Sequence, residues 1–451
     1  MDLNNLAAAN ANISKFSVFS NYTGDEIDIR GSIARLYYYE SILDNTVRMT
    51  INMVDGGKEV GNNNSTSKLE YPQSFSAGEK CNIIIEDGYN QEINLTNDYH
   101  LRVQFIRNII TDALSSSYTV DFYSEESIKN HETSRRVERR YEGKIHDSIS
   151  KILKDYLDTP KNIYSDPTIN DLVVYGNSKK PFARIHELAT QSAPELDKNS
   201  LGTYAGYLFY ENQLGYNFRS IDLLFKKDPV RKLIYNNTTG LPPGYDTKIL
   251  KFSYNSVVNL EAKLLTGSMF DVELKTFNLY DNKYDGEKVK EFSSKSQLED
   301  DDYTGGTEEI FLAKDLNIGA TKTNFIVKDI GISNPGKKLE TQLKKSKEVN
   351  FDIENIERQA KSRYNNLFTT KLSVTIPGDF SLKCGDLVYC TIAELSNKKN
   401  QDISDRNSGI YMIVDLCHYI NSNPSVTKLS GKCFTQLSLV RDTFGRKPLK
   451  S

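Results

Sequence analysis

The chain has 451 residues, and its 57 Lys and Arg against 60 Asp and Glu give a net charge of −3. A chain of this length is expected to form about two to four domains, which excludes a small disulfide-stapled scaffold. The balanced charge provides no global basic field for nucleic acid or anionic lipid, and no apolar run approaches the ~20 residues of a membrane helix.

The composition is that of a folded protein, with 38% apolar and 26% charged residues. The N-terminal residues lack the basic and apolar regions of a secretory signal. We therefore expect synthesis in a reducing cytoplasm, no membrane-spanning segment and no bridges among the five cysteines.

Alternating strands dominate the chain from Ser17 to Tyr123. In the run NTVRMTINM, apolar residues from Val47 to Met53 alternate with polar ones, as a strand with one buried face requires. These strands predict a first antiparallel β-barrel over residues 16–126, preceded by an N-terminal arm at 1–15. Two further runs, LRVQF and YTVDF, repeat the alternation with Leu101, Val103 and Phe105, and with Tyr118, Val120 and Phe122.

A helical period replaces the alternation after Glu125. The run IHDSISKILKDYLD places Ile145, Ile149, Ile152, Leu153 and Tyr156 on one helix face. A second helix is predicted to open at Pro181, because proline suits the first helical position. With a short strand at 172–175, these elements predict a small helical domain over residues 127–200.

The remainder of the chain predicts a second, discontinuous barrel. An aromatic hairpin turns at 212–215, and a helix at 351–368 precedes four strand-like runs. Because two strands do not form a stable sheet alone, we expect 201–225 to join 351–443 in this barrel. The polar stretch 226–350 is interpreted as an inserted domain, and 444–451 as a C-terminal tail. The fold class is therefore α+β and mostly β.

Two loops approximate binding motifs. The segment 331–338 follows the phosphate-loop pattern, but Lys338 replaces the magnesium-binding hydroxyl and Pro335 lacks an N–H donor. The segment 300–305 is similar to a calcium loop, but Phe311 stands where a bidentate Glu belongs. We interpret both as ordinary surface connections.

Neighbouring nucleophilic and basic residues do not form catalytic pairs. Cys417 and His418 are adjacent on a predicted strand, so their side chains point to opposite faces. The pairs His146-Asp147 and His186-Glu187 are adjacent on helices, where such neighbours do not face each other. No catalytic, metal-binding or cofactor-binding residue is predicted, and the partner-binding residues are not identified.

The basic run 134–140 has a local electrostatic interpretation. Acidic residues at Glu138 and Glu142 interleave it, and no aromatic stacking ladder accompanies it. We expect a solvated face or an inter-subunit salt bridge rather than a nucleic-acid site.

The order of these segments resembles the baseplate hub protein of contractile-tailed phages, the T-even type. The resemblance rests on ARLYYYESILDNTVRMTINMVDGG, on the passage from LRVQFIRN to IHDSISKIL, and on the hairpin YAGYLFYENQLGYNFRSID. It continues through LSVTIPGDFSLKCGDLVYCTI and the strands that end near 443. It covers residues 16–443 in segment order, and the stretch 226–350 matches least.

The resemblance implies a homotrimeric ring with two tube-like barrels per subunit. Such a ring joins a six-fold tail tube to a three-fold central spike and leaves a channel for DNA. The implied partners are further copies of the chain, the spike or needle protein, the tail tube or tube-initiator protein, and the baseplate wedge proteins. The implied location is the virion tail baseplate, assembled in the host cytoplasm, with no enzyme activity, no cofactor and no stable membrane insertion.

Two other functions remain open from the sequence. A virion-associated enzyme that degrades the cell wall requires paired carboxylates, which leave no sequence signature. A receptor-binding module requires exposed aromatic platforms. The order of two barrels around a helical domain argues against both, but only through the resemblance.

Overall fold

The computed structural model describes residues 9–22, 24–55, 76–112, 115–195, 204–235, 248–255, 353–393, 403–404, 407–421 and 430–443. It also places four two-residue strands between 274 and 325, namely β16 (Leu274–Lys275), β17 (Phe277–Asn278), β18 (Lys283–Tyr284) and β19 (Asn324–Phe325). The statements below refer to these residues. The two binding-motif segments, 300–311 and 331–338, lie outside them, as does most of the predicted inserted domain.

A 14-stranded sheet forms the body of the protein. Eight of its strands, in the order β22, β3, β4, β8, β7, β5, β1 and β23, form a closed ring because β22 also pairs with β23. The short strands β2 and β6 extend β1 and β5. The strands of this first barrel are β1 (Ala9–Phe19), β2 (Glu26–Asp28), β3 (Ile33–Ser41), β4 (Arg48–Asp55), β5 (Lys80–Asp87), β6 (Glu92–Leu95), β7 (Leu101–Thr111), β8 (Ser116–Ser124), β22 (Gly409–Asn421) and β23 (Ser430–Arg441).

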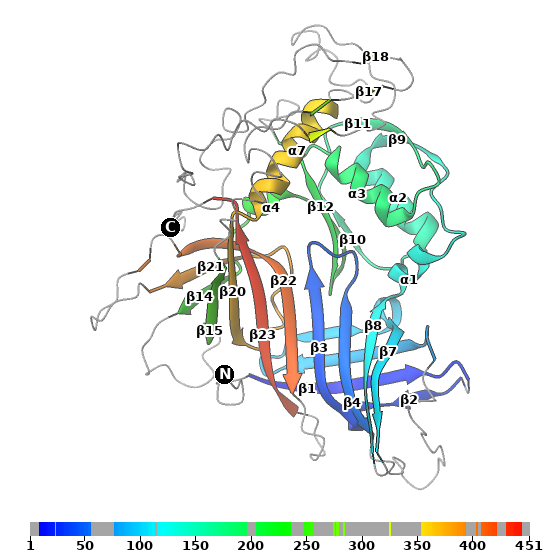
Figure 1. The fold of residues 1–451 in the computed structure, drawn as a ribbon, viewed down its shortest axis with the longest axis vertical. Helices are drawn as coiled ribbons and strands as arrows, with labels where there is room; N and C mark the ends of the chain where they lie inside the picture. Colours follow the sequence, from blue (N-terminus) through cyan, green and yellow to red (C-terminus); the bar gives the residue numbers. More distant parts are fainter. Residues whose placement is uncertain are drawn as a thin grey trace.

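The β22–β23 hairpin is shared with a second barrel. On one edge, β22 pairs with β21 near Gly409 and with β3 beyond Asp415. On the other side of the hairpin, β23 pairs with β1 through 430–433 and with β20 through 434–441. The second barrel adds β14 (Arg231–Tyr235), β15 (Lys251–Asn255), β20 (Thr370–Pro377) and β21 (Leu387–Ile392), and a bridge between Ile234 and Lys248 joins β14 to the segment before β15. Figure 1 shows these strands to the left of β3 and β4.

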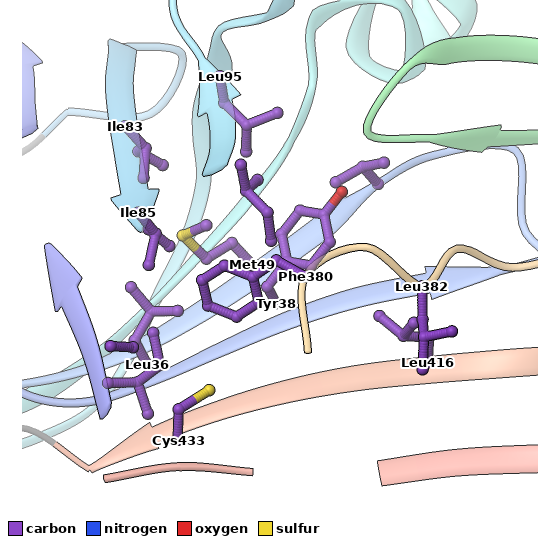
Figure 2. Packing of buried hydrophobic residues seen from close by; sticks show 14 of the residues in the cluster. Leu36, Tyr38, Met49, Ile83, Ile85, Leu95, Phe380, Leu382, Leu416 and Cys433 are labelled. Carbon is purple, nitrogen blue, oxygen red and sulfur yellow. The ribbon is translucent and has the colours of Figure 1, made fainter. Parts of the chain in front are cut away.

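One hydrophobic core runs through both barrels. Side chains that alternate inward along the strands are almost fully buried, among them Met49, Ile51 and Val120. The loop after β20 inserts Phe380 and Leu382 into the same cluster, and Figure 2 shows Phe380 beside Tyr38 and Met49. The two barrels are therefore packed as one body rather than as independent units.

The helical module has its own core above the first barrel (Figure 1). A three-stranded sheet of β10, β13 and β12 and a two-stranded sheet of β11 and β9 pack with its helices. Its elements are α1 (Glu125–His131), β9 (Arg140–Lys144), α2 (Ile145–Leu157), β10 (Ile163–Ser165), β11 (Asp171–Tyr175), α3 (Pro181–Thr190), β12 (Tyr207–Asn212) and β13 (Gly215–Ser220). Helices α4 (Ile221–Phe225) and α7 (Ile353–Leu367) contribute to a neighbouring cluster that also contains side chains of β21, β22 and β23. One-turn 3-10 helices lie at Arg30–Ser32 and Asn97–Tyr99 in the barrel.

The expected mostly-β fold is confirmed, as are the main helices. Helix α2 buries Ile145, Ile149, Ile152 and Leu153, and α3 begins at Pro181 as predicted. The alternating runs at 47–53 and 118–122 bury every apolar residue that the pattern placed inside.

The strand pairing differs from the expected segment boundaries at three places. Residues 9–15, expected to be an arm, belong to β1 and pair with β5 and β23. Two short strands inside the stretch assigned to the insertion, 231–235 and 251–255, belong to the second barrel. The hairpin 207–220 forms strand pairs with β10 and not with the C-terminal strands. One face of β12 packs into the helical module, and its other face contacts side chains of β21 and β22 without backbone pairing.

Candidate functional site

The histidines and cysteines singled out by sequence do not form a reactive centre. His418 is buried, lies between the rings of Tyr38 and Phe380, and its Nδ1 is 2.9 Å from Thr435 Oγ1. Burial lowers the pKa of His418 to about 3 and raises the pKa of the Cys417 thiol to about 12. As predicted, the two side chains occupy opposite faces of β22, so both residues are structural.

The helical histidines connect neighbouring elements. His146 Nδ1 lies 3.0 Å from Thr168 Oγ1, and His186 Nε2 lies 2.7 Å from Asn45 Oδ1 in the barrel. His146 Nε2 does approach Asp147, at 3.7 Å, although we expected these neighbours not to face each other. That distance exceeds a hydrogen bond, and Glu187 pairs with Lys179 and Arg184 instead of His186.

Three arginines of the basic run form ion pairs within the chain. Arg135 pairs with Asp158 at 2.7 Å, Arg139 with Asp155 at 3.2 Å, and Arg140 with Glu142 at 2.5 Å. This arrangement agrees with the expected solvated face. Among the described residues, no group of three or more His, Cys, Asp or Glu is placed to hold a metal ion. No helix in the described part of the chain is long and apolar enough to cross a bilayer.

The outward face of β3, β4, β8 and β7 carries aromatic and charged side chains around a cavity, and we call it the outer face. Its strand register places Tyr39, Arg48 and Tyr123 in one row, and Thr50, Asp121 and Phe105 in the next. These rows surround an open cavity of about 480 Å³. The cavity is lined by Tyr39, Arg48, Thr50, Phe105, Ile106, Arg107, Asp121 and Tyr123.

The charges of the cavity are held in fixed positions. Asp121 accepts hydrogen bonds from Thr50 Oγ1 at 2.6 Å and from Arg107 Nη2 at 3.1 Å. Arg48 Nε lies 3.1 Å from Asp44 at the rim. Tyrosine and arginine are enriched where proteins bind other proteins, so this composition suits a macromolecular interface.

The β7 strand adds an apolar edge to the outer face. On one side, β7 pairs with β8 along its length. On the other side, it pairs with β5 only at Leu101 and Arg102, and Val103 then forms backbone hydrogen bonds with residues 78 and 79. Beyond Val103 it has no strand partner on this side among the residues that the structure describes. Phe105 and Ile110 are 54% and 63% exposed on this stretch. An unpaired apolar edge is a site at which another chain can add.

A second polar site lies buried where the helical module meets the barrels. Lys161 Nζ contacts Glu126 Oε2 and Glu211 Oε1, each at 2.6 Å, and all three side chains are at most 2% exposed. Glu211 also accepts a hydrogen bond from Val47 N of the barrel at 2.9 Å. Desolvation lowers the pKa of Lys161, but the two carboxylates outweigh it and raise the pKa above its usual value.

Glu40, on strand β3 of the first barrel, connects the barrel to the helical module from the other side of the junction. Its carboxylate accepts hydrogen bonds from Tyr38 Oη at 2.8 Å, Gln213 N at 2.7 Å and Cys384 N at 3.0 Å. Burial nevertheless raises the pKa of Glu40 to about 7. One carboxylate thus links β3 to the β12–β13 turn and to the loop before β21. We call Glu40, Glu126, Lys161 and Glu211 the junction cluster.

Sequence reasoning missed both sites for physical reasons. Phe105 was placed on the buried face with Leu101 and Val103, but a bulge between Val103 and Phe105 turns it outward. The junction cluster contains residues up to 171 positions apart in the sequence. No local sequence pattern indicates that these residues lie close together in the fold. The only sequence feature that indicated the junction cluster was the presence of charged residues inside apolar runs, such as Glu40 close after Tyr38.

The comparisons with known proteins concern the fold. No protein-family model matches the chain, and no curated protein sequence matches it. Among solved structures, the tail protein from Neisseria meningitidis MC58 aligns with 95% of this chain and 96% of its own, at TM-score 0.53 and 9% identity. The 43 kDa tail protein of prophage MuSo2 from Shewanella oneidensis aligns with 95% of this chain and 98% of its own, also at TM-score 0.53 and 9% identity. The chain therefore has the fold of these two tail proteins along nearly its whole length.

Proposed function

We propose that this chain is a structural protein of a phage tail and forms the hub of its baseplate. The observation that carries the proposal is the pair of barrels joined through one shared hairpin, in a chain that has the fold of two tail proteins from end to end. A molecule organised in this way supplies two ring segments held at a fixed relative position.

Three copies supply six barrels. A homotrimer of this chain therefore presents near-six-fold symmetry to a tail tube and three-fold symmetry to a central spike. DNA passes through the central channel in transit, and the near-neutral charge of the chain avoids holding it there. The spike, the tail tube or its initiator and the baseplate wedges are the proposed partners, in a virion assembled in the host cytoplasm.

The proposed role is mechanical and needs no reaction or cofactor. A cell-wall hydrolase requires carboxylates that substrate can reach. Glu126 and Glu211 approach the same ammonium group, but both are buried beneath the junction and bound to Lys161. Their arrangement suits a rigid connection between the module and the barrels. The part of the predicted insertion between β15 and α7 remains a proposed separate domain.

Native mass spectrometry with negative-stain imaging of the purified chain tests the proposal. The expected species has about three times the 51.2 kDa subunit mass and appears as a ring with a central hole. A chain that stays a compact monomer, even when co-expressed with the neighbouring tail proteins, would contradict the hub and favour the cell-wall enzyme.

A further inference from the structure

The junction cluster contains more buried negative charge than positive charge. Glu40, Glu126 and Glu211 bring three carboxyl groups into one region that excludes solvent, where Lys161 pairs with two of them. With every group ionised, three carboxylates and one ammonium give this region a net charge of −3 + 1 = −2. A buried charge without a partner of opposite sign is costly, and a carboxylate loses its charge by binding a proton.

The titratable groups around the cluster are supplied by several elements. Beside Glu40 they are Tyr38 on the same strand, Cys384 and Asp386 on the loop before β21, and Glu211 on β12. Beside Glu211 they are Lys161, Glu126 on α1 and Tyr216 on β13. Around Asp386 they are Tyr210, Lys227 and Lys383. Within the part of the chain that the structure describes, no cation forms an ion pair with Glu40.

Each carboxyl group of the cluster is bound by one hydroxyl group. The three pairs are Tyr38 Oη to Glu40 at 2.8 Å, Thr159 Oγ1 to Glu126 at 2.7 Å, and Ser124 Oγ to Glu211. A hydroxyl group donates to an ionised carboxylate and, after its O–H bond rotates, accepts from a protonated one. The cluster can therefore bind or release a proton while its heavy atoms stay in place.

Glu40 and Glu211 hold the module and the first barrel together from opposite sides. Gln213 N in the β12–β13 turn of the module and Cys384 N before β21 donate to Glu40 at 2.7 Å and 3.0 Å. From the module, Glu211 accepts a hydrogen bond from Val47 N of the barrel at 2.9 Å. Repulsion between the two carboxylates therefore acts across the contact between module and barrel.

We propose that the junction cluster is a proton-dependent clamp, in which a proton held at Glu40 locks the helical module onto the first barrel and its release loosens the module. Burial raises the pKa of Glu40 to about 7, and burial also raises the pKa of Glu211. The closed junction therefore binds the proton more tightly than an opened one, in which Glu40 has its ordinary pKa. The clamp is tight below pH 7 and weakens as the pH rises through it. The inference does not depend on the proposed hub.

Hydrogen exchange of the full-length chain, measured by mass spectrometry from about pH 6 to about pH 8, tests the clamp. Peptides that contain Gln213 and Cys384 report on it directly, because these amides donate to Glu40. After correction for the intrinsic effect of pH on exchange, their protection is expected to fall about 10-fold over this interval. In Glu40→Gln the side chain is neutral throughout, so the protection is expected to stay constant.

Two further variants separate the proton from the packing. Tyr38→Phe removes a donor to the ionised form of Glu40, so the decrease in protection is expected to begin at higher pH. Glu142→Gln changes a carboxyl group of the module that is 60% exposed, and it is expected to keep the wild-type profile. Wild type and Tyr38→Phe are sufficient for the test if Glu40→Gln does not fold.

Three outcomes would overturn the clamp and leave the proposed hub unaffected. The first is wild-type protection that does not change with pH, and the second is a Glu40→Gln variant that keeps the 10-fold decrease. The third is junction peptides that exchange as slowly as the core strand β4 at every pH. In that case the junction would open only when the whole protein unfolds.

Discussion

The junction cluster and the outer face treat polar and apolar groups in opposite ways. At the junction, charged side chains are buried and each one has partners inside the same chain. On the outer face, apolar side chains such as Phe105 and Ile110 are left exposed beside a cavity. This difference in burial shows which groups have all their contacts within one copy of the chain. The junction fixes the module on the barrels, whereas the outer face keeps apolar side chains exposed in the single copy.

The largest effect is expected from removing the cation of the junction. Lys161→Met leaves Glu126 and Glu211 buried without their shared partner, and the free energy of unfolding should fall by about 3–5 kcal/mol. Chemical denaturation measures the change. Lys154→Met, at an exposed position on the adjacent helix α2, serves as the control and should change stability by less than about 0.5 kcal/mol. Equal losses in the two variants would show that the cluster carries no special role.

Two positions of β4 compare the inner and outer faces within one strand. Ile51→Ala removes a fully buried side chain and should cost about 2–5 kcal/mol of unfolding free energy. Val54→Ala removes an outward side chain that is 46% exposed, and should cost little in the free subunit. Thermal and denaturant unfolding of subunits kept monomeric measure both. A large cost at Val54 would mean that the outer face is already packed within one copy.

Glu40 gives the junction a pH dependence of defined sign. Its pKa in the folded protein, about 7, lies above the ordinary value of 4.5, so the folded state binds the proton more tightly than the unfolded state. The stability from this group is fully present below pH 4.5 and is lost as pH rises through 7. His418, with its pKa lowered to about 3, acts in the opposite direction between pH 3 and 6.5.

Comparison of wild type with Glu40→Gln isolates the contribution of Glu40 to the pH dependence of stability. The stability difference between the two proteins should decline by up to about 1.4 kcal/mol per pH unit between pH 4.5 and 7. Urea unfolding at a series of pH values gives the curve. In the variant, the opposing effect of His418 should be more visible, as stability that increases with pH. Parallel curves for the two proteins would place the pKa of Glu40 in the ordinary range.

The smallest effect is expected on the outer face itself. Arg107→Gln breaks the pair with Asp121, but the arginine side chain is 57% exposed. Exposed ion pairs contribute little to stability, so the unfolding free energy of the subunit should stay close to that of wild type. Denaturation at low and high salt measures it. A loss comparable to that of Lys161→Met would erase the distinction between the two regions.

Periodicity predicted the elements that are buried on one side. The face of α2 and the alternating run ending at Met53 repeat often enough for burial to be read directly. The Ala-Asn alternation at the start of β1 is too weakly apolar to indicate a strand, and only its pairing with β5 and β23 places it in the barrel. The short strands at 231–235 and 251–255 are similarly defined by their partners.

The candidate site was less predictable than the fold because it depends on register between distant segments. Tyr39, Arg48 and Tyr123 form one row only through the pairing of β3, β4 and β8, yet each alone is an ordinary strand residue. A single bulge in β7 moved Phe105 from the core to the surface. Local alternation cannot locate such an irregularity, because the residues on both sides of it keep the same pattern.

The shared hairpin also determines when the chain can fold during synthesis. β3 and β1 each pair with a strand that is made almost at the end of translation, and Ser41 bonds to Asp415 across 374 residues. Until β22 and β23 leave the ribosome, two barrel edges stay open, and contacts of such sequence separation form slowly. A prematurely ended chain keeps those edges unpaired and is prone to aggregate. Only a chain translated through its last strand closes the barrel, so completion of synthesis controls which copies are available for assembly.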